Sequence, residues 1–274
     1  MDGVEALVFD VFGTVVDWRS SVEQELISLG RKYSVGEAIL EAPTDDTKLH
    51  PSYSDGENWR DFAQEWRSGY ITNTRRLAVE GSTSFNVDKM HREILDGMLN
   101  SQRWSHLGKV WDEEERQNLN KVWHHLNGSP FPEIGPQSHP NMYSGWPDAT
   151  EGLYALKKQK LIATLSNGNV RLLVDMAKHA DLPWDVIFST ELFDTFKPNP
   201  RAYQGVIRHL SLPPEKCAMV AAHIFDLRAA ASQGMKTIYV NRAEEEWDPT
   251  NTISEEVDLV VSSFVELASI LGAK

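Results

Sequence analysis

Short strand, loop and helix patterns alternate through the second half of the chain, and this alternation constrains the fold more than any other feature. Apolar runs short enough for buried strands lie at 4–9, 161–165, 185–188, 217–222 and 236–240. Helical patterns follow the second, third and fourth runs, at 170–180, at 201–210 and in the stretch that ends at Gln233. This order predicts a parallel sheet with right-handed crossovers, in which ligands bind beyond the carboxyl ends of the strands. The expected fold class is α/β, with a Rossmann-like parallel sheet as its core.

A long helical segment separates the first strand from the others. Between about Trp18 and Asn127 the spacing of apolar residues becomes helical and tryptophan is frequent. The segment is predicted to hold helices at 20–33, 57–80, 86–99 and 113–126. Asn86 and Asp112 are suited to open the third and fourth helices, because their side chains accept hydrogen bonds from free backbone N–H groups.

Two further features set the expected domain boundaries. Phe62, Trp66 and Tyr70 recur about one helical turn apart, as the core of a small helical bundle requires. The five prolines between 128 and 147 predict an irregular return to the sheet. We therefore expect an α/β core domain formed by residues 1–17 and 146–274, and an inserted helical-bundle cap domain formed by residues 18–145.

The first strand delivers one carboxylate, that of Asp10, to a glycine turn. Gly13 relaxes the backbone of this turn, and Thr14 supplies a hydroxyl donor. Asp10 is the predicted nucleophile, and a helix N-cap is the alternative reading. Hydrolases that use such a turn on phosphate esters carry a second acid two residues later, which protonates the leaving alkoxide. Phe12 stands at that position and has no proton to donate, so the leaving group needs none, and halide is the obvious candidate.

Four segments of the chain, in this order, carry a resemblance to a known superfamily. They are Asp10-Val11-Phe12-Gly13-Thr14, Ser166-Asn167, Lys197-Pro198 and His223-Ile224-Phe225-Asp226. With them the sequence resembles the haloacid dehalogenase superfamily, and within it the type II 2-haloacid dehalogenases, over nearly the whole chain. The resemblance implies the fold of that superfamily and hydrolysis of short 2-haloalkanoic acids to 2-hydroxy acids. It also implies an ester intermediate on Asp10, a small carboxylate substrate, and no metal or organic cofactor.

Residues from three of the predicted loops are expected to converge on Asp10. Ser166 and Asn167 lie at a helix start and can bind an anionic oxygen together with nearby backbone N–H groups, although Ser166 alone could be a helix cap. The resemblance places Lys197 beside the nucleophile, where its charge keeps Asp10 ionised. Asp226 completes the group at the same edge of the sheet.

The last of these loops departs from two known patterns. Magnesium phosphatases usually present a Gly-Asp pair ahead of a second aspartate, whereas this loop retains only Asp226, which favours metal-free chemistry. The best-known dehalogenase pattern has serine and asparagine where Ala221 and His223 stand. The group that activates the hydrolytic water is therefore open between His223 and Asp226.

A cation from the helical segment is expected to hold the substrate carboxylate. Arg67 follows Trp66, and this pair resembles the arginine that binds the substrate carboxylate in the family. Arg60 also follows a tryptophan and is its rival. Phe12 and Phe225 flank the predicted nucleophile and are expected to form an apolar cradle for halide, whereas the tryptophans belong to the core of the bundle.

Composition limits the partners and the compartment. The chain has 274 residues and a net charge of −13, which argues against nucleic acids and anionic membranes as partners. The single cysteine, Cys217, precedes or opens an apolar strand and is predicted to be buried. With neither an apolar run long enough for a membrane span nor a cleavable leader, a cytoplasmic location is expected. A homodimer is left open.

Two alternatives keep the fold and change the function. In the first, Asp10 and Asp226 bind magnesium and the protein hydrolyses a small phosphate ester. In the second, the scaffold binds or transforms another small carboxylate. Phe12 weighs against the first, and the combination of Asp10, Lys197 and Asp226 weighs against an inactive scaffold.

Overall fold

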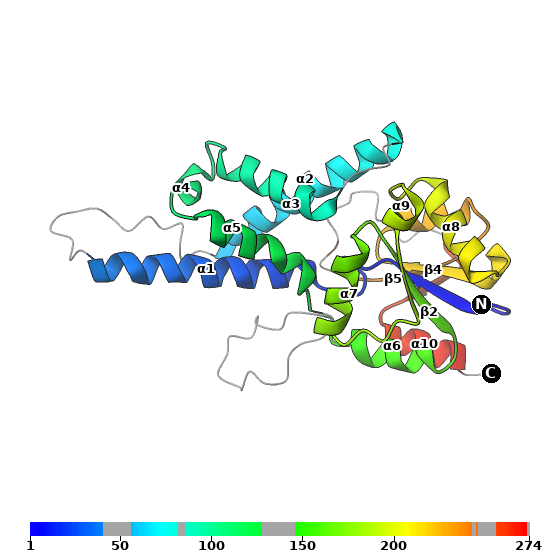
Figure 1. The fold of residues 1–274 in the computed structure, drawn as a ribbon. Coiled ribbons are helices and arrows are strands. Elements are labelled where there is room, and N and C mark those ends of the chain that lie inside the picture. Colours follow the sequence, from blue (N-terminus) through cyan, green and yellow to red (C-terminus); the bar gives the residue numbers. More distant parts are fainter. Residues whose placement is uncertain (41–55, 82–85, 128–145, 243–244, 246–255, 273–274) are drawn as a thin grey trace.

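A six-stranded parallel sheet forms the centre of the molecule. The computed structural model describes residues 1–40, 56–81, 86–127, 146–242, 245 and 256–272 (Figure 1). Its strands are β1 (Ala6–Phe9), β2 (Leu161–Ser166), β3 (Val186–Ser189), β4 (Cys217–Ala221), β5 (Lys236–Val240) and β6 (Leu259–Val261). The predicted α/β parallel sheet is confirmed. Only β6 was missed, because it is three residues long and just one of its side chains is buried.

The order of the strands places a ligand crevice at the end of β1. The sheet runs β3-β2-β1-β4-β5-β6, so the chain builds outward from β1 on one side and then from β4 on the other. Phe9, the last residue of β1, is in register with Thr164 of β2 and Val220 of β4. Such a reversal of strand order opens a crevice at the carboxyl ends of the strands. Asp10 is the next residue after β1 and lies at this crevice.

Helices cover both faces of the sheet because the side chains of β1 alternate between two apolar clusters. Leu7 and Phe9 pack on the side covered by α6 (Ala149–Lys157), α7 (Val170–His179) and α10 (Phe264–Gly272). Ala6 and Val8 pack on the side of α8 (Pro200–Leu210) and α9 (Ile224–Ala231), as Figure 1 shows. Cys217 is a free, buried thiol in this second cluster, as predicted.

The helical segment between β1 and β2 contains the predicted helices, but the first one extends to Leu40, seven residues beyond its predicted end at 33. Its α-helices are α1 (Trp18–Leu40), α2 (Gly56–Glu80), α3 (Val87–Leu99), α4 (Ser105–Gly108) and α5 (Glu113–Asn120). Asn86 and Asp112 cap α3 and α5 as expected. The predicted fourth helix ends earlier, at Asn120, and a 3₁₀ helix, η2 (Lys121–His124), continues it. Most of the predicted irregular return, 128–147, lies outside the described residues.

Tryptophans form the core of this segment and stay out of the crevice. Trp59 and Trp111 stack with their ring planes 17° apart, and Trp18 and Trp123 stack with theirs 21° apart.

Short 3₁₀ helices elsewhere are η3 (Thr190–Phe193) and η4 (Pro214–Lys216). In the parts of the chain that the structure describes, no helix is long and apolar enough to cross a membrane.

Polar and apolar contacts hold α2 and α3 against the loops of the sheet. Asn169, just before α7, accepts a hydrogen bond from the backbone N–H of Val87 at 3.0 Å. Phe196, in the loop after β3, is buried in one cluster with Leu77 and Ala78 of α2 and with residues of α3. The helical segment therefore has a fixed place above the carboxyl ends of the strands.

Candidate active site

The turn after β1 holds the carboxylate of Asp10 in one orientation. Gly13 has a φ of +81°, which a glycine adopts at little cost. The Thr14 hydroxyl donates to Asp10 Oδ2 at 2.8 Å and accepts from the Ala222 backbone N–H at 3.0 Å. Arg242 is buried and donates from Nε to the Thr14 carbonyl at 3.1 Å. The turn is therefore tied to β4 and to the loop after β5.

Lys197 lies between two buried carboxylates. Its Nζ donates to Asp10 Oδ1 at 2.7 Å and to Asp226 Oδ2 at 2.5 Å. Burial raises the pKa of Asp10, but the charges of Lys197 and His223 and their hydrogen bonds outweigh it, so that pKa lies far below its usual value. Asp10 is therefore ionised over the whole range in which the protein would work. The predicted pairing of Lys197 with Asp10 is present.

Asp226 faces Lys197 and not the crevice. Its side chain is fully buried, and Tyr203 donates its hydroxyl proton to Asp226 Oδ1. Burial raises the pKa of Asp226 and outweighs the opposing effect of Lys197. Both carboxylate oxygens are therefore occupied behind Lys197, which makes Asp226 a positioning residue in this arrangement. Of the two groups considered for water activation, His223 alone lines the cavity.

His223 links the nucleophile to a second buried acid. Its Nδ1 lies 2.9 Å from Asp10 Oδ2 and its Nε2 lies 3.2 Å from Glu245 Oε2. Burial lowers the pKa of His223, but the hydrogen bonds to Asp10 and Glu245 outweigh it and raise that pKa to about 9. At neutral pH the resting site therefore contains an imidazolium between two carboxylates.

Glu245 can come close to His223 because Gly13, in the turn after β1, has no side chain. A Cβ on Gly13 would lie 2.5 Å from the carboxyl carbon of Glu245. Trp18 Nε1 donates to Glu245 Oε1 at 2.7 Å, and the residue is 1% exposed. Sequence reasoning missed Glu245, since it stands in a run of three glutamates, 244–246, with no pattern to single out the middle one. The signal that could have marked the run is its place just after a strand of the sheet.

Replacing Glu245 by glutamine should lower the pKa of His223 below its value of about 9, because the imidazolium loses one of two carboxylate partners. The charged His223 stabilises the fold fully below pH 6.5, and this contribution is lost as the pH rises through about 9. In Glu245→Gln the loss should therefore occur at lower pH. NMR titration of the histidine rings measures the shift, with Glu266→Gln, an exposed acid, as control. An unchanged pKa would contradict the contact.

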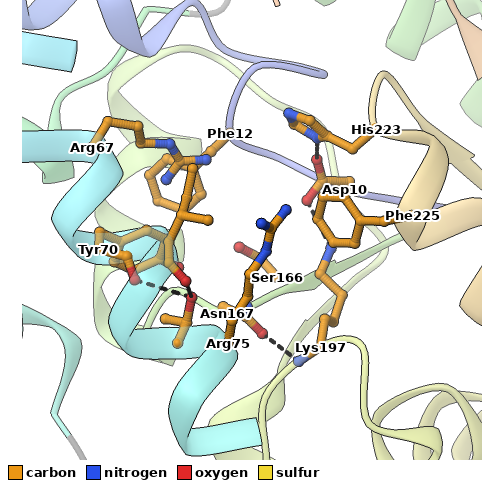
Figure 2. A pocket seen from close by; sticks show the side chains of 12 residues that line it. Asp10, Phe12, Arg67, Tyr70, Arg75, Ser166, Asn167, Lys197, His223 and Phe225 are labelled. Carbon is orange, nitrogen blue, oxygen red and sulfur yellow. Dashed lines mark hydrogen bonds and ion pairs between the residues drawn. The ribbon is translucent and has the colours of Figure 1, made fainter. Parts of the chain in front are cut away.

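Ser166 and Asn167 lie at the end of β2 and line the cavity. The Ser166 hydroxyl accepts from the backbone N–H of Gly168 at 3.2 Å, which shapes the loop. The Asn167 side-chain carbonyl accepts from the backbone N–H of Lys197 at 2.7 Å (Figure 2). Asn167 thus holds the loop that carries Lys197, in addition to facing the cavity.

One face of α2 closes the cavity from the other side. The lining residues of α2 are spaced i, i+3, i+4, i+7 and i+8, as one helix face requires, and are Arg67, Tyr70, Ile71, Thr74 and Arg75. Phe12 and Phe225 complete the lining from the sheet side, as expected for an apolar cradle (Figure 2). The enclosed space is about 50 Å³, which suits a small ligand.

Arg67 is buried at the inner end of this face. Its guanidinium carbon lies 5.1 Å from the ring centroid of Phe12, 5.5 Å from that of Trp18 and 4.9 Å from that of Tyr70. Nη1 is buried without a hydrogen-bond partner, an arrangement that an anionic ligand would satisfy. Arg60 is exposed and does not line the cavity. The structure therefore brings Arg67, and not its rival, to the predicted nucleophile.

The acidic groups of the site do not fit a magnesium ion. Asp10 Oδ1 is bound by Lys197, and Oδ2 by Thr14 and His223. Asp226 has no oxygen free either, because Lys197 and Tyr203 occupy both. Hard cations need several oxygen ligands around one point. Over the described residues, no group of three or more histidine, cysteine or acidic side chains could hold a metal ion.

The ionised carboxylate of Asp10 can attack a carbon atom. Phe12 stands where related hydrolases have an acid, and it cannot protonate a leaving alkoxide. This chemistry places the protein among hydrolases with a carboxylate nucleophile. The family model of the haloacid dehalogenase-like hydrolases matches residues 4–234. The chain belongs to this family, and the superfamily predicted from its motifs is confirmed.

Individual relatives agree with this assignment. (S)-2-haloacid dehalogenase 1 of Pseudomonas sp. (strain CBS-3) is 32% identical over 245 residues, which cover 88% of this chain and 86% of that protein. An L-2-haloacid dehalogenase structure covers 98% of this chain and 99% of its own, with a TM-score of 0.73 and 30% identity. The structure of a defluorinating L-2-haloacid dehalogenase covers 98% of this chain and 95% of its own, with a TM-score of 0.76 and 29% identity.

Proposed function

We propose that the protein hydrolyses the (S)-enantiomers of short 2-haloalkanoic acids to 2-hydroxy acids, through an ester on Asp10. The observation that carries the proposal is the ionised carboxylate of Asp10 beside Phe12, with Arg67 opposite. The names of the relatives support the substrate class and the enantiomer. Residues 18–145 would act as the cap over this site, in a cytoplasmic enzyme whose dimerisation stays a prediction.

Binding of the substrate must overcome repulsion between two carboxylates. Two like charges about 4 Å apart repel by about 4 kcal/mol at an effective dielectric constant near 20. Arg67 offsets this by binding the substrate carboxylate in a bidentate fork, which also supplies the partner that its Nη1 lacks. The aromatic rings around Arg67 exclude water and fix the direction of the fork.

In the first step an oxygen of Asp10 attacks C2 of the substrate from the side opposite the halogen. A carbon–oxygen bond forms, the carbon–halogen bond breaks, and halide leaves with the bonding electrons. No proton is needed, which agrees with Phe12 at the position of the acid. The configuration at C2 is inverted, so an (S)-2-haloacid gives an (R)-2-hydroxy acid.

In the second step the ester on Asp10 is hydrolysed with the help of His223. Esterification removes the negative charge of Asp10, which is one of the two acids that raise the pKa of His223. The imidazolium then loses its proton to solvent, and the neutral ring accepts a proton from the attacking water. That proton passes from the ring to the leaving alkoxide, which becomes the hydroxyl group of the product. The second proton of the water, left on the new carboxyl group of Asp10, then passes to the ring, so that the carboxylate of Asp10 and the imidazolium are both restored. Glu245 holds the ring throughout as a positioning residue.

Halide release from a panel of 2-haloacids tests the proposal. We expect chelator-resistant release from chloroacetate, bromoacetate and (S)-2-chloropropionate, with (R)-2-chloropropionate at least about tenfold slower, since one misplaced contact costs about 1.4 kcal/mol or more. Fluoroacetate extends the panel to a stronger bond. Release of phosphate from esters only in the presence of magnesium, with no halide release, would overturn the proposal.

A further inference from the structure

A second arginine of α2 faces the same cavity as Arg67. Arg75 lies eight residues further along, about 12 Å on the helix axis. Its guanidinium carbon is 5.3 Å from the ring centroid of Phe225, which belongs to the opposite wall. Figure 2 shows the Arg75 side chain extending from α2 into the cavity, toward Phe225. Arg75 is exposed, in contrast to the buried Arg67, so the two arginines mark the mouth and the inner end of one cavity.

Arg76, the next residue on α2, has a structural role that contrasts with that of Arg75. Arg76 donates from Nη1 to Glu80 Oε2 at 2.7 Å, in an exposed ion pair one turn apart. Over the described residues, Arg75 has no hydrogen-bond or ion-pair partner and instead lies against the ring of Phe225 on α9. Asp10 supplies the carboxylate among the residues that line the cavity, and it is already held by Lys197 and His223. Within the described part of the chain, the cavity therefore contains an arginine that no anionic side chain binds.

The position of Arg75 is fixed relative to the nucleophile. Leu77 and Ala78, which follow it on α2, are buried against Phe196 in the loop after β3. Asn199 of the same loop donates to the Ala78 carbonyl at 3.5 Å. Lys197, the partner of the nucleophile, stands between Phe196 and Asn199 in this loop. Arg75 and Asp10 are thus joined through a single packed loop, as a binding site for one ligand requires.

We propose that Arg75 binds a second carboxylate of the substrate, so that the enzyme prefers 2-halodicarboxylates, such as 2-chlorosuccinate, to 2-halomonocarboxylates of the same length. This inference rests on the proposed function. The carboxylate next to C2 binds Arg67 inside the cavity, and the distal carboxylate binds Arg75 at the mouth. Arginine suits this task because its planar fork binds a carboxylate through two parallel hydrogen bonds. Phe225 holds the fork in place from the other side.

Two four-carbon substrates test the preference directly. Halide release is measured with (S)-2-chlorosuccinate and (S)-2-chlorobutyrate, which differ in one terminal carboxylate. The wild-type kcat/KM should be at least about tenfold higher for chlorosuccinate, as a charge-assisted hydrogen bond implies. Arg75→Gln should lower the ratio of the two values by about tenfold or more, mainly through KM. Arg76→Gln, the matched control, should leave both values unchanged.

Binding of the products gives a readout that does not depend on turnover. Inhibition by (R)-malate should be stronger than inhibition by (R)-2-hydroxybutyrate, and Arg75→Gln should abolish the difference. A wild-type enzyme without preference, or an Arg75→Gln variant with equal losses on both substrates, overturns the assignment of Arg75. The proposed function survives either result as long as chlorobutyrate releases halide. It fails separately if no haloacid releases halide with the wild-type enzyme.

Discussion

Replacing Asp10 by asparagine should reduce dehalogenase turnover by roughly four to six orders of magnitude, the loss typical of an enzyme without its nucleophile. The amide is neutral and cannot form an ester on C2. Lys197 would still hold Asp226, so the fold should persist. Halide release from (S)-2-chloropropionate measures the effect, and the thermal midpoint of unfolding checks the fold. Asp61→Asn, which changes an exposed aspartate, is the matched control.

A single-turnover experiment in water that carries heavy oxygen identifies the intermediate. With enzyme in excess, the label should enter the carboxylate of Asp10 and not the product, because water attacks the carbonyl carbon of the ester. Mass spectrometry of the peptide that contains Asp10 measures the incorporation. Label in the hydroxyl group of the first product instead would mean direct attack of water on C2, and Asp10 would lose the role of nucleophile.

The Asp10→Asn variant also probes the electrostatics of the second step. An asparagine resembles the esterified aspartate in carrying no charge, so His223 should have a lower pKa in this variant than in the resting enzyme, where it is raised to about 9. The same loss of charge is what allows the imidazole to act as a base after the first step. The contact between His223 Nδ1 and Asp10 Oδ2 therefore makes His223 a base only after Asp10 has been esterified, which sets the order of the two steps.

Much of the site could be predicted because its residues lie at the carboxyl ends of strands or in the loops that follow them. Asp10 follows β1, Ser166 ends β2, and Lys197 and His223 lie in the loops after β3 and β4. The geometry of a parallel sheet brings these positions to one edge. The local sequence pattern and the topology of parallel sheets are sufficient to predict this part of the site. The positions of the strands in the sequence therefore predict both the fold class and the sheet half of the cavity.

The helical half of the cavity depends on long-range packing. Arg60 and Arg67 are seven residues apart, which is about two helical turns, so both point to nearly the same side of α2. Periodicity cannot separate them. They differ by about 10 Å along the helix axis, and only the docking of α2 on the loops of the sheet decides which one meets the cavity. That docking rests on residues as distant in sequence as Ala78 and Phe196.

Two roles could not be assigned from sequence spacing alone. Asp226 was considered as a base because it follows His223 closely in the sequence. It is the third residue of α9, and its side chain turns inward, toward Tyr203. Glu245 was missed because its place depends on the path of the loop after β5 and on a turn with no Cβ at Gly13. Both are consequences of packing between segments more than 20 residues apart.

Replacing His223 by glutamine should separate the two steps of the reaction. Glutamine can keep a hydrogen bond near Asp10 but cannot accept a proton from water at neutral pH. Attack on C2 needs no proton transfer, so halide should appear in a burst of about one equivalent per active site. Hydrolysis of the ester should then slow by about 10²–10⁴-fold, the usual contribution of a general base. His209→Gln, which changes an exposed histidine, serves as the control.

The accumulated ester is the decisive observation for this variant. After the burst, the intact mass of His223→Gln should rise by the mass of the substrate less halide, while Asp10→Asn should show no adduct. If the burst and the steady-state rate fell together, His223 would act mainly by orienting Asp10 for attack, since Nδ1 lies 2.9 Å from Oδ2. If a burst without decay appeared also in Glu245→Gln, the second acid would be required to hold the ring for its work as a base. The pair of variants therefore distinguishes a residue that moves the proton from one that positions it.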